Sequence, residues 1–202
     1  MRRFQFLAAV AFVLSLAGPA LSQAASPQPA PQPQPRPHGR RVAVEPSRVV
    51  VDDGDTVVVR WPGGDAETVR VLGIDTPETR HVLHDIPFDQ PFGPEARAFA
   101  QGAFAAATRV ELLRSATLDP YGRSLGYLFL DGRNYSVLVI AAHLAEESVS
   151  HYGDNGLPGE AAEVLAAARA AGPVPFEPPH AYRDRMRELS AWMRRAGTPP
   201  EP

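Results

Sequence analysis

The chain has 202 residues, no cysteine and a formal net charge of −3 at pH 7. The lack of cysteine excludes a disulfide framework and a lipid-modified cysteine anchor. All 20 basic residues are arginine, and a net negative chain is a poor general binder of nucleic acid, so any phosphate has to be bound by a few local arginines.

The first 26 residues have the pattern of an export signal. Arg2 and Arg3 precede an apolar run over residues 4–16, and small residues that suit a signal peptidase follow. The apolar run is short for a membrane span, and a retained membrane anchor is the alternative interpretation. Cleavage would remove two arginines and no acidic residue, which takes the net charge from −3 to −5. We expect a secreted or periplasmic protein, a monomer without stable membrane association after cleavage.

Residues 27–40 are rich in proline and glutamine and are interpreted as a linker, because such segments favour extended polyproline II and cannot support a core. The folded domain is predicted over residues 41–196, with a tail over residues 197–202. About 155 residues are enough for one domain with a sizeable core.

The first part of the domain is predicted to be a hairpin meander. β-Branched runs at 49–51 and 56–61 indicate strands, and a Pro-Gly-Gly turn at 62–65 separates the second from a returning strand over 67–74. Residues 81–92 contain prolines without periodicity and are interpreted as a loop.

The rest of the domain is predicted to hold four helices and two strands. Pro94 suits the first turn of the first helix, whose small-residue face should be its packing face. The predicted elements are a helix over 94–107, strands over 108–113 and 124–130, a short helix over 137–145, an extended segment over 147–152, and helices over 160–171 and 181–195. The small-residue face of the first helix comprises Ala98, Phe99, Gly102, Ala103 and Ala106.

The last predicted helix carries an apolar stripe and many arginines. The stripe is expected to dock on the core, and the arginines are interpreted as a solvated face rather than a nucleic-acid contact. The stripe comprises Tyr182, Met186, Leu189, Trp192 and Met193, and the arginines are Arg183, Arg185, Arg187, Arg194 and Arg195.

The number of strands and the positions of the helices indicate the fold class. Five strands with a helix after the third, followed by C-terminal helices, predict an α+β fold built on a five-stranded OB-type β-barrel.

Acidic residues and an arginine gather around the predicted hairpin. Asp53 and Asp55 lie in its first turn, and Asp75 and Glu78 follow the returning strand, which carries Arg70. Converging carboxylates are costly without a cation between them, so a hard metal ion is the natural occupant, and the arginine suggests a phosphate beside it. In the alternative interpretation the aspartates cap turns and Arg70 forms a surface ion pair.

Four short motifs follow one another in a fixed order. They are Asp53-Gly54-Asp55-Thr56, Arg70-x4-Asp75-Thr76-Pro77-Glu78, Gly93-Pro94-Glu95-Ala96, and Asp119-x-Tyr121-Gly122-Arg123-x3-Gly126-Tyr127. Together they resemble the thermonuclease, or staphylococcal nuclease-like, family. The likeness covers residues 49–152 and, more loosely, the last helix. It implies an OB-fold with a calcium-dependent phosphodiesterase site that hydrolyses DNA and RNA with little sequence preference.

The resemblance implies a role for individual positions. Asp55 and Asp75 match carboxylate ligands of Ca²⁺, Thr76 a backbone carbonyl ligand, Glu78 the general base, Arg70 and Arg123 phosphate-binding arginines, and Tyr121 and Tyr152 positions near the bound nucleotide. Chemistry at these residue types agrees, because a carboxylate can deprotonate a water and arginines can bind phosphate oxygens in pairs. Asp53 is then interpreted as a turn residue rather than a ligand.

The chain also departs from the family pattern. Pro120 stands where a basic residue is expected, and the expected pair of tyrosines is reduced to Tyr152. Residues 157–179 look like an insertion before the last helix. Two other functions stay open on the sequence alone: a noncatalytic OB-fold module that binds nucleic acid or a protein, and a phosphodiesterase with a different substrate.

Overall fold

The structure is a computed structural model that describes residues 36–198. The predicted export signal lies outside these residues, as do most of the predicted linker and tail. No helix in the described part of the chain is long and apolar enough to cross a membrane. The strands are β1 (Arg41–Val44), β2 (Val49–Val51), β3 (Thr56–Arg60), β4 (Ala66–Val71), β5 (Ile74–Asp75), β6 (Val110–Leu118), β7 (Ser124–Leu130), β8 (Arg133–Asn134) and β9 (Glu146–Glu147). The helices are η1 (Pro46–Arg48), η2 (Val82–His84), α1 (Gly93–Ala106), α2 (Tyr135–Ala141), α3 (Val149–Tyr152), α4 (Pro158–Ala171) and α5 (Pro179–Arg195).

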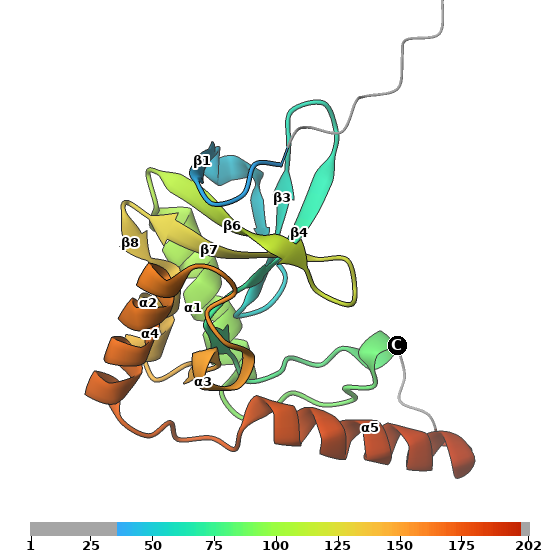
Figure 1. Ribbon diagram of the computed structural model, residues 1–202. Helices are drawn as coiled ribbons and strands as arrows, with labels where there is room; N and C mark the ends of the chain where they lie inside the picture. Colours follow the sequence, from blue (N-terminus) through green and yellow to red (C-terminus); the bar gives the residue numbers. More distant parts are fainter. Residues whose placement is uncertain (1–35, 199–202) are drawn as a thin grey trace, which may run out of the picture. The chain divides into compact units, whose positions relative to one another are not determined.

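The main sheet is curled, with strands in the order β1-β6-β7-β4-β3-β2 and β8 beside β7 (Figure 1). β4 pairs in parallel with β7, and the other neighbours pair antiparallel. The five predicted strands correspond to β2, β3, β4, β6 and β7, and α1 follows the third of them. The predicted α+β fold of the OB type is therefore confirmed, with additional short strands at its margins.

Alternating β-branched residues form the core face of the hairpin. Val57 and Val59 of β3 and Val69 and Val71 of β4 are at most 1% exposed. The returning strand does not run to residue 74 as predicted. It ends at Val71, and a turn with Gly73 at φ +81° leads into β5, which pairs with β9 in a separate two-stranded sheet. This break turns Asp75 away from the main sheet.

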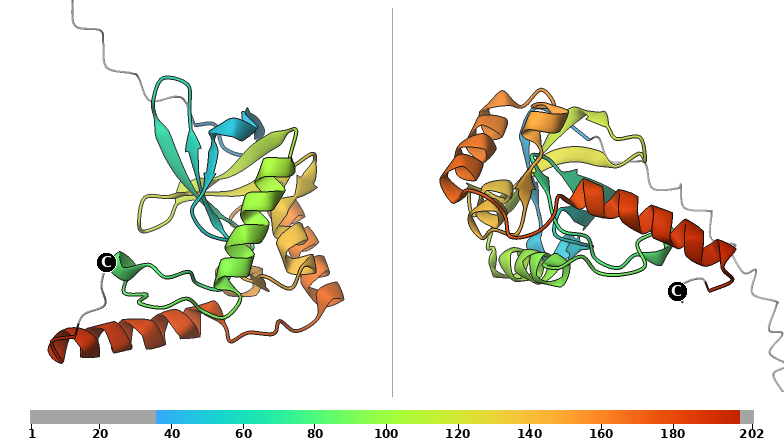
Figure 2. Two further views of the ribbon diagram at one scale, coloured as in Figure 1. Left: turned by 180° about the vertical axis from the view of Figure 1, so that it is seen from behind. Right: turned by 90° about the horizontal axis from the view of Figure 1, so that it is seen from below.

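Helix α1 packs with a face that only partly matches the predicted one. Ala96, Ala100 and Phe104 are buried, and the ring of Phe104 lies 5.1 Å from that of Tyr135, centroid to centroid. Of the predicted face, Ala98, Gly102 and Ala106 are exposed, whereas Phe99 and Ala103 are partly buried and pack against the core. The large Phe104 side chain decides the rotation, because burying it gains more than burying a row of alanines and a glycine. Figure 2 shows α1, in green, beside the sheet.

Two predictions for residues 137–152 need correction. The short helix begins earlier, at Tyr135, because the side chain of Asn134 caps it by accepting a hydrogen bond from the Ser136 amide at 3.1 Å. Residues 147–152 are not extended: after the two-residue strand β9, residues 149–152 form the single helical turn α3. Period-two patterning over so few residues does not separate a strand from one helical turn.

The docking partner predicted for α5 is wrong. Tyr182 and Met186 are buried in a small cluster with Ile86, which is separate from the main core. Three hydrogen bonds join α5 to the same loop. The Tyr182 hydroxyl donates to the carbonyl of Phe88 at 3.0 Å, the Ser190 hydroxyl donates to the carbonyl of Asp85 at 3.1 Å, and Arg194 Nη1 donates to the carboxylate of Asp85. Helix α5 therefore covers the loop over residues 79–92, as Figures 1 and 2 show.

Candidate active site

The turn between β2 and β3 places Asp55. The Asp53 carboxylate accepts a hydrogen bond from the Asp55 amide at 3.0 Å, which makes Asp53 a turn-forming residue. A side chain at Gly54 would bring its Cβ to 2.7 Å from the hydroxyl of Thr76, so this close approach requires glycine. The hydroxyl of Tyr135 donates to the carbonyl of Gly54 at 2.7 Å. The turn is thus fixed from both sides.

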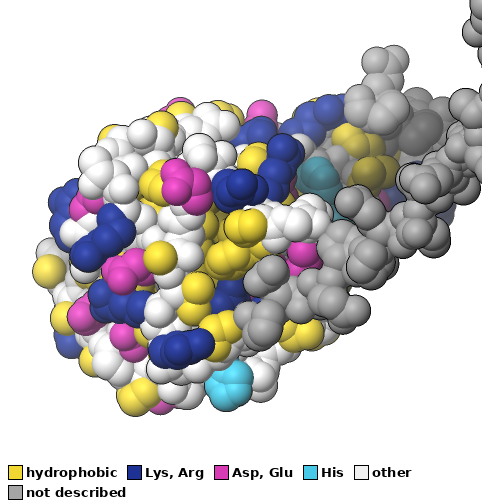
Figure 3. Space-filling model, turned by 90° about the horizontal axis from the view of Figure 1, so that it is seen from above, with side chains coloured by type: hydrophobic (Ala, Val, Ile, Leu, Met, Phe, Trp, Pro, Cys, Tyr) yellow, Lys and Arg dark blue, Asp and Glu magenta, His cyan; other side chains and the backbone are white. Residues whose placement is uncertain are grey.

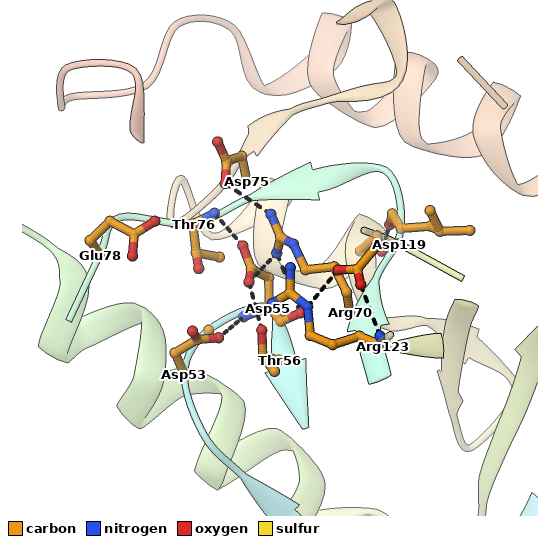
Figure 4. Close-up of polar contacts among 12 residues, drawn as sticks. Asp53, Asp55, Thr56, Arg70, Asp75, Thr76, Glu78, Asp119 and Arg123 are labelled. Atoms are coloured by element: carbon orange, nitrogen blue, oxygen red, sulfur yellow. Dashed lines mark hydrogen bonds and ion pairs between the residues drawn. The ribbon is translucent and has the colours of Figure 1, made fainter. Parts of the chain in front are cut away.

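The two predicted carboxylate ligands lie together and are nearly buried. Asp55 is 6% exposed and Asp75 is 5% exposed. The Thr76 amide donates to Asp55 Oδ2 at 2.9 Å. Arg70 lies between the two carboxylates: Nη1 forms an ion pair with Asp55, and Nη2 donates to Asp75 Oδ1 at 2.9 Å (Figure 4). Because the chain turns after β4, Asp75 lies beside Arg70, which is a residue of β4.

Glu78 is half-buried and its backbone is fixed by Gln90. The Glu78 amide donates to Gln90 Oε1 at 3.1 Å, and the Gln90 amide donates to the Glu78 carbonyl at 2.8 Å. The Gln90 side chain in turn donates to the carbonyl of Glu177 at 2.7 Å. Gly93, the first residue of α1, also packs against this point, because a Cβ there would overlap the carbonyl oxygen of Glu78.

Gly93→Ala is expected to destabilise the fold by about 1–3 kcal/mol, because the Glu78 backbone has to move to admit the methyl group. Gly102→Ala is the matched control, since a Cβ at Gly102 of the same helix meets nothing within 4 Å. The control should gain up to about 1 kcal/mol from better helix propensity. Urea unfolding measures both changes, and equal effects would contradict the close packing at Gly93.

Arg183 of α5 completes the cluster, and sequence reasoning missed it. Its Nη1 donates to Asp75 Oδ1 at 2.9 Å and to Glu78 Oε1 at 2.6 Å, and its Nη2 donates to Asp75 Oδ2 at 2.9 Å. The residue was predicted to lie on a solvated face. It follows the buried Tyr182 directly, but no sequence signal placed this part of the helix over the loop, so the direction of its side chain was not predictable.

Arg123 approaches from the turn between β6 and β7. Its Nε donates to Asp119 Oδ2 at 2.6 Å, and its amide donates to Asp119 Oδ1 at 2.8 Å. Burial works to raise the pKa of Asp119, but the hydrogen bonds from Arg123 outweigh it and lower that pKa. The guanidinium lies 5.6 Å from the ring of Tyr121, which is highly exposed. Asp119 therefore aims this arginine.

One cleft of about 1000 Å³ connects most of the predicted site. Asp75 faces a smaller pocket of about 230 Å³ beside β9 and α3 instead. Thr76 packs against the turn that carries Asp55, and its backbone amide donates a hydrogen bond to the Asp55 carboxylate. The predicted residues that line the large cleft are Asp55, Arg70, Glu78, Tyr121, Arg123 and Tyr152.

Burial and neighbouring charge shift the pKa values of two acids at the site. The pKa of Glu78 is raised, first by burial and also by the nearby carboxylates of Asp53 and Asp75, against the lowering effect of Arg183. The pKa of Asp53 is raised by burial, against the lowering effect of Arg70. A carboxylate with a raised pKa is a stronger base, which suits Glu78 to proton abstraction.

Asp55, Asp75 and Thr76 offer only oxygen donors to a cation. Asp55 and Asp75 supply carboxylate oxygens, and no hydrogen bond within residues 36–198 uses the carbonyl oxygen of Thr76. These are hard oxygen donors of the kind that Ca²⁺ prefers. Residues 36–198 contain no group of three or more His, Cys, Asp or Glu side chains arranged around a metal. The set fits Ca²⁺ only if water or substrate oxygens provide the remaining ligands.

One face of the surface carries mixed charge. On the face shown in Figure 3, arginine and acidic side chains lie interspersed among apolar ones. The fields of neighbouring charges of opposite sign partly cancel at a distance. Salt also screens exposed charges beyond about 8–10 Å.

Comparison with known proteins identifies the family of the chain and several similar proteins. The family model described as "Staphylococcal nuclease homologue" matches residues 68–172. The chain is 38% identical over 96 residues to a thermonuclease of Staphylococcus intermedius, with 47% of this chain and 54% of that protein covered. It is 33% identical over 94 residues to the SPbeta prophage-derived endonuclease YokF of Bacillus subtilis, strain 168, which covers 46% of this chain and 30% of that protein. Endonuclease YncB of the same strain is 32% identical over 94 residues, covering 46% and 43%. The chain thus spans about half or less of the length of these relatives.

The extent of the match corrects one prediction and leaves two regions outside it. Residues 157–172, which include α4, belong to the matched region, so the interpretation of residues 157–179 as an insertion is wrong for most of its length. The turn that carries Asp55 precedes the match, and α5 with Arg183 follows it. Tertiary contacts bring both regions to the site: Asp55 bonds to Thr76, and Arg183 bonds to Asp75.

Proposed function

Because the chain belongs to the staphylococcal nuclease homologue family, we propose that it is a calcium-dependent nuclease that hydrolyses phosphodiester bonds of DNA and RNA with little sequence preference. The observation that carries this proposal is the convergence of Asp55, Arg70, Glu78 and Arg123 on one cleft, with Asp75 bonded to Arg70. Carboxylates, a base and arginines together are the groups that phosphodiester hydrolysis needs.

The residues divide the reaction between them. Arg70 and Arg123 bind non-bridging phosphate oxygens and stabilise the charge that develops on them. Glu78 takes a proton from a water whose oxygen forms the new bond to phosphorus. The bond from phosphorus to the leaving oxygen then breaks, and that oxygen takes up a proton from solvent. Arginine suits this task better than lysine because its planar group binds two oxygens at once.

Asp55, Asp75 and the carbonyl of Thr76 are the groups that would hold Ca²⁺, which when bound supplies positive charge beside the phosphate. Both aspartates are bonded to Arg70 in the structure. Their shared pairing with one guanidinium holds the two carboxylates close together.

Low sequence preference follows from the aromatic residues of the cleft. Tyr121 and Tyr152 are 78% and 61% exposed, and both line the cleft. Stacking on an exposed ring favours every base, because each base has a π-face. Substrate strands are therefore expected to be bound by stacking and by phosphate contacts rather than by reading of base edges.

The proposal predicts digestion of DNA and RNA by the purified protein with Ca²⁺, loss of digestion with EDTA, and loss of at least about 10²-fold in Arg123→Ala. Calcium should also raise the melting temperature, because a ligand of the native state stabilises it in proportion to RT ln(1 + [L]/Kd). Digestion that persists in EDTA, or an Arg123→Ala variant with full activity, would contradict the proposed site. An unchanged melting temperature at millimolar Ca²⁺ would argue against the cation.

A further inference from the structure

Arg183 links two residues that have different proposed tasks. It reaches the site from α5, more than a hundred positions along the chain, and bonds both oxygens of Asp75 and one oxygen of Glu78. Its side chain is 21% exposed. Hydrogen bonds between charged groups at these distances are roughly twice as strong as neutral ones. Three such bonds from one guanidinium form a built contact rather than a chance surface pair.

The two oxygens of Glu78 are treated differently. Oε1 accepts from Arg183 at 2.6 Å, and no donor within residues 36–198 is bonded to Oε2. A carboxylate held by one oxygen cannot rotate freely, so its other oxygen keeps a fixed direction. Since Glu78 lines the cleft, the arrangement leaves an acceptor available to a water there.

We propose that Arg183 is a positioning residue of the nuclease site: it holds the Glu78 carboxylate in the orientation that proton abstraction requires, and it sets the distance of that carboxylate from Asp75. The inference rests on the proposed function. It adds α5 to the machinery, although the family match ends before this helix.

The docking of α5 supports this role. The hydroxyl of Tyr182 donates to the carbonyl of Phe88 and so fixes the helix to the loop that follows Glu78. The segment just before the helix is fixed to the same loop, because the Gln90 side chain donates to the carbonyl of Glu177. These contacts place the backbone of Arg183 without using its guanidinium. The side chain is therefore free to act on the carboxylates alone, and its role can be separated from that of the helix.

The neighbouring Arg185 provides a matched control. It lies two residues further along α5 and pairs with Glu177 at 2.7 Å, where both side chains are exposed. Exchanging either arginine for methionine removes the same charge from the same helix. Exposed pairs of this kind contribute little to stability.

The experiment compares Arg183→Met, Arg183→Lys and Arg185→Met with wild type, in Ca²⁺ and with one DNA substrate. Arg183→Met should lower kcat about 10- to 100-fold, the range typical of groups that orient a catalytic shell, with KM within about threefold. Arg183→Lys should fall between, because an ammonium lacks the planar fork. Arg185→Met should keep wild-type activity. Two further variants are tested with free guanidinium ion, well below its denaturing concentration. The ion should restore part of the activity of Arg183→Ala, and it should restore no activity to Glu78→Gln.

A crystal structure of each variant tests the same contact without any activity. The Glu78 carboxylate should take a different orientation or several orientations in Arg183→Met, with α5 still docked, and should keep the wild-type orientation in Arg185→Met, because Arg183, and not Arg185, donates to it. Inactive wild-type protein would refute the nuclease proposal, whereas an unchanged Glu78 carboxylate in Arg183→Met would refute the positioning role by itself. Higher activity or tighter Ca²⁺ binding in Arg183→Met would also overturn it, because Arg183 would then act as a competitor of the cation.

Discussion

Glu78→Gln is expected to lower kcat by about 10²–10⁴-fold, the range typical for loss of a general acid or base. Glutamine keeps the size of the side chain but cannot take up a proton. The amide can still accept one hydrogen bond from Arg183, so the loop and α5 should keep their packing. Single-turnover cleavage of a short labelled DNA, with the protein in excess over the substrate, measures the chemical step directly.

Glu177→Gln is the matched control for this substitution. Glu177 is a glutamate of the same region and receives the same substitution, but its side chain is exposed and pairs with Arg185. The control should cleave at the wild-type rate. Equal loss in both variants would mean that the effect comes from the net charge of the region. Full activity in Glu78→Gln would show that another group takes the proton.

Arg114→Met is expected to lower the free energy of unfolding by about 3–5 kcal/mol, because it leaves a buried carboxylate without its partner. Arg114 is a buried residue of strand β6, and its Nε and Nη2 donate to the two oxygens of Glu67 in β4, each at 2.7 Å. Glu67 is only 1% exposed and also accepts from the indole of Trp61 at 2.8 Å. Denaturant unfolding monitored by tryptophan fluorescence measures the loss.

Two further variants distinguish loss of the Arg114–Glu67 pair from the effect of removing any arginine. Arg97→Met removes an exposed arginine of α1 and should change stability by no more than about 0.5 kcal/mol. The double variant Glu67→Gln with Arg114→Met should regain part of the loss, because no buried charge then remains. A double variant as unstable as the sum of the two single ones would contradict this explanation.

The same pair predicts a dependence of stability on pH. Burial works to raise the pKa of Glu67, but hydrogen bonds from Arg114, Ser124 and Trp61 outweigh it and hold the pKa below its ordinary value of 4.5. A carboxylate with a lowered pKa in the folded state stabilises the fold fully above its unfolded pKa, and this contribution is lost as the pH falls through the folded pKa. Wild-type stability should therefore fall more steeply below about pH 4.5 than that of the double variant.

Local motifs made the first half of the site predictable. Asp55, Arg70, Asp75 and Glu78 lie within one hairpin and its exit, so their proximity follows from short-range turn geometry. Arg123 was predictable only through the family likeness, since the parallel pairing of β4 with β7 that brings it near is a long-range contact. The roles assigned to these residues stay predictions, while their positions in one region are described by the structure.

The part contributed by α5 was not predictable, for a physical reason. Amphipathic spacing identified the helix and its apolar stripe, and the helix forms as Pro179–Arg195. Periodicity does not specify a docking partner, however, and the partner is the loop containing Ile86 rather than the barrel. The same limit explains α1, where Phe104 rather than the small residues determined the buried face.

The separation of the Ile86, Tyr182 and Met186 cluster from the main core divides the cooperativity of the molecule. A segment that buries its apolar surface in its own small cluster can open at a lower free energy than global unfolding. Opening of α5 with the loop would leave the barrel, Asp55 and Arg70 in place while releasing the contacts that fix Glu78. Activity would then be lost at a lower temperature than the one at which the barrel unfolds.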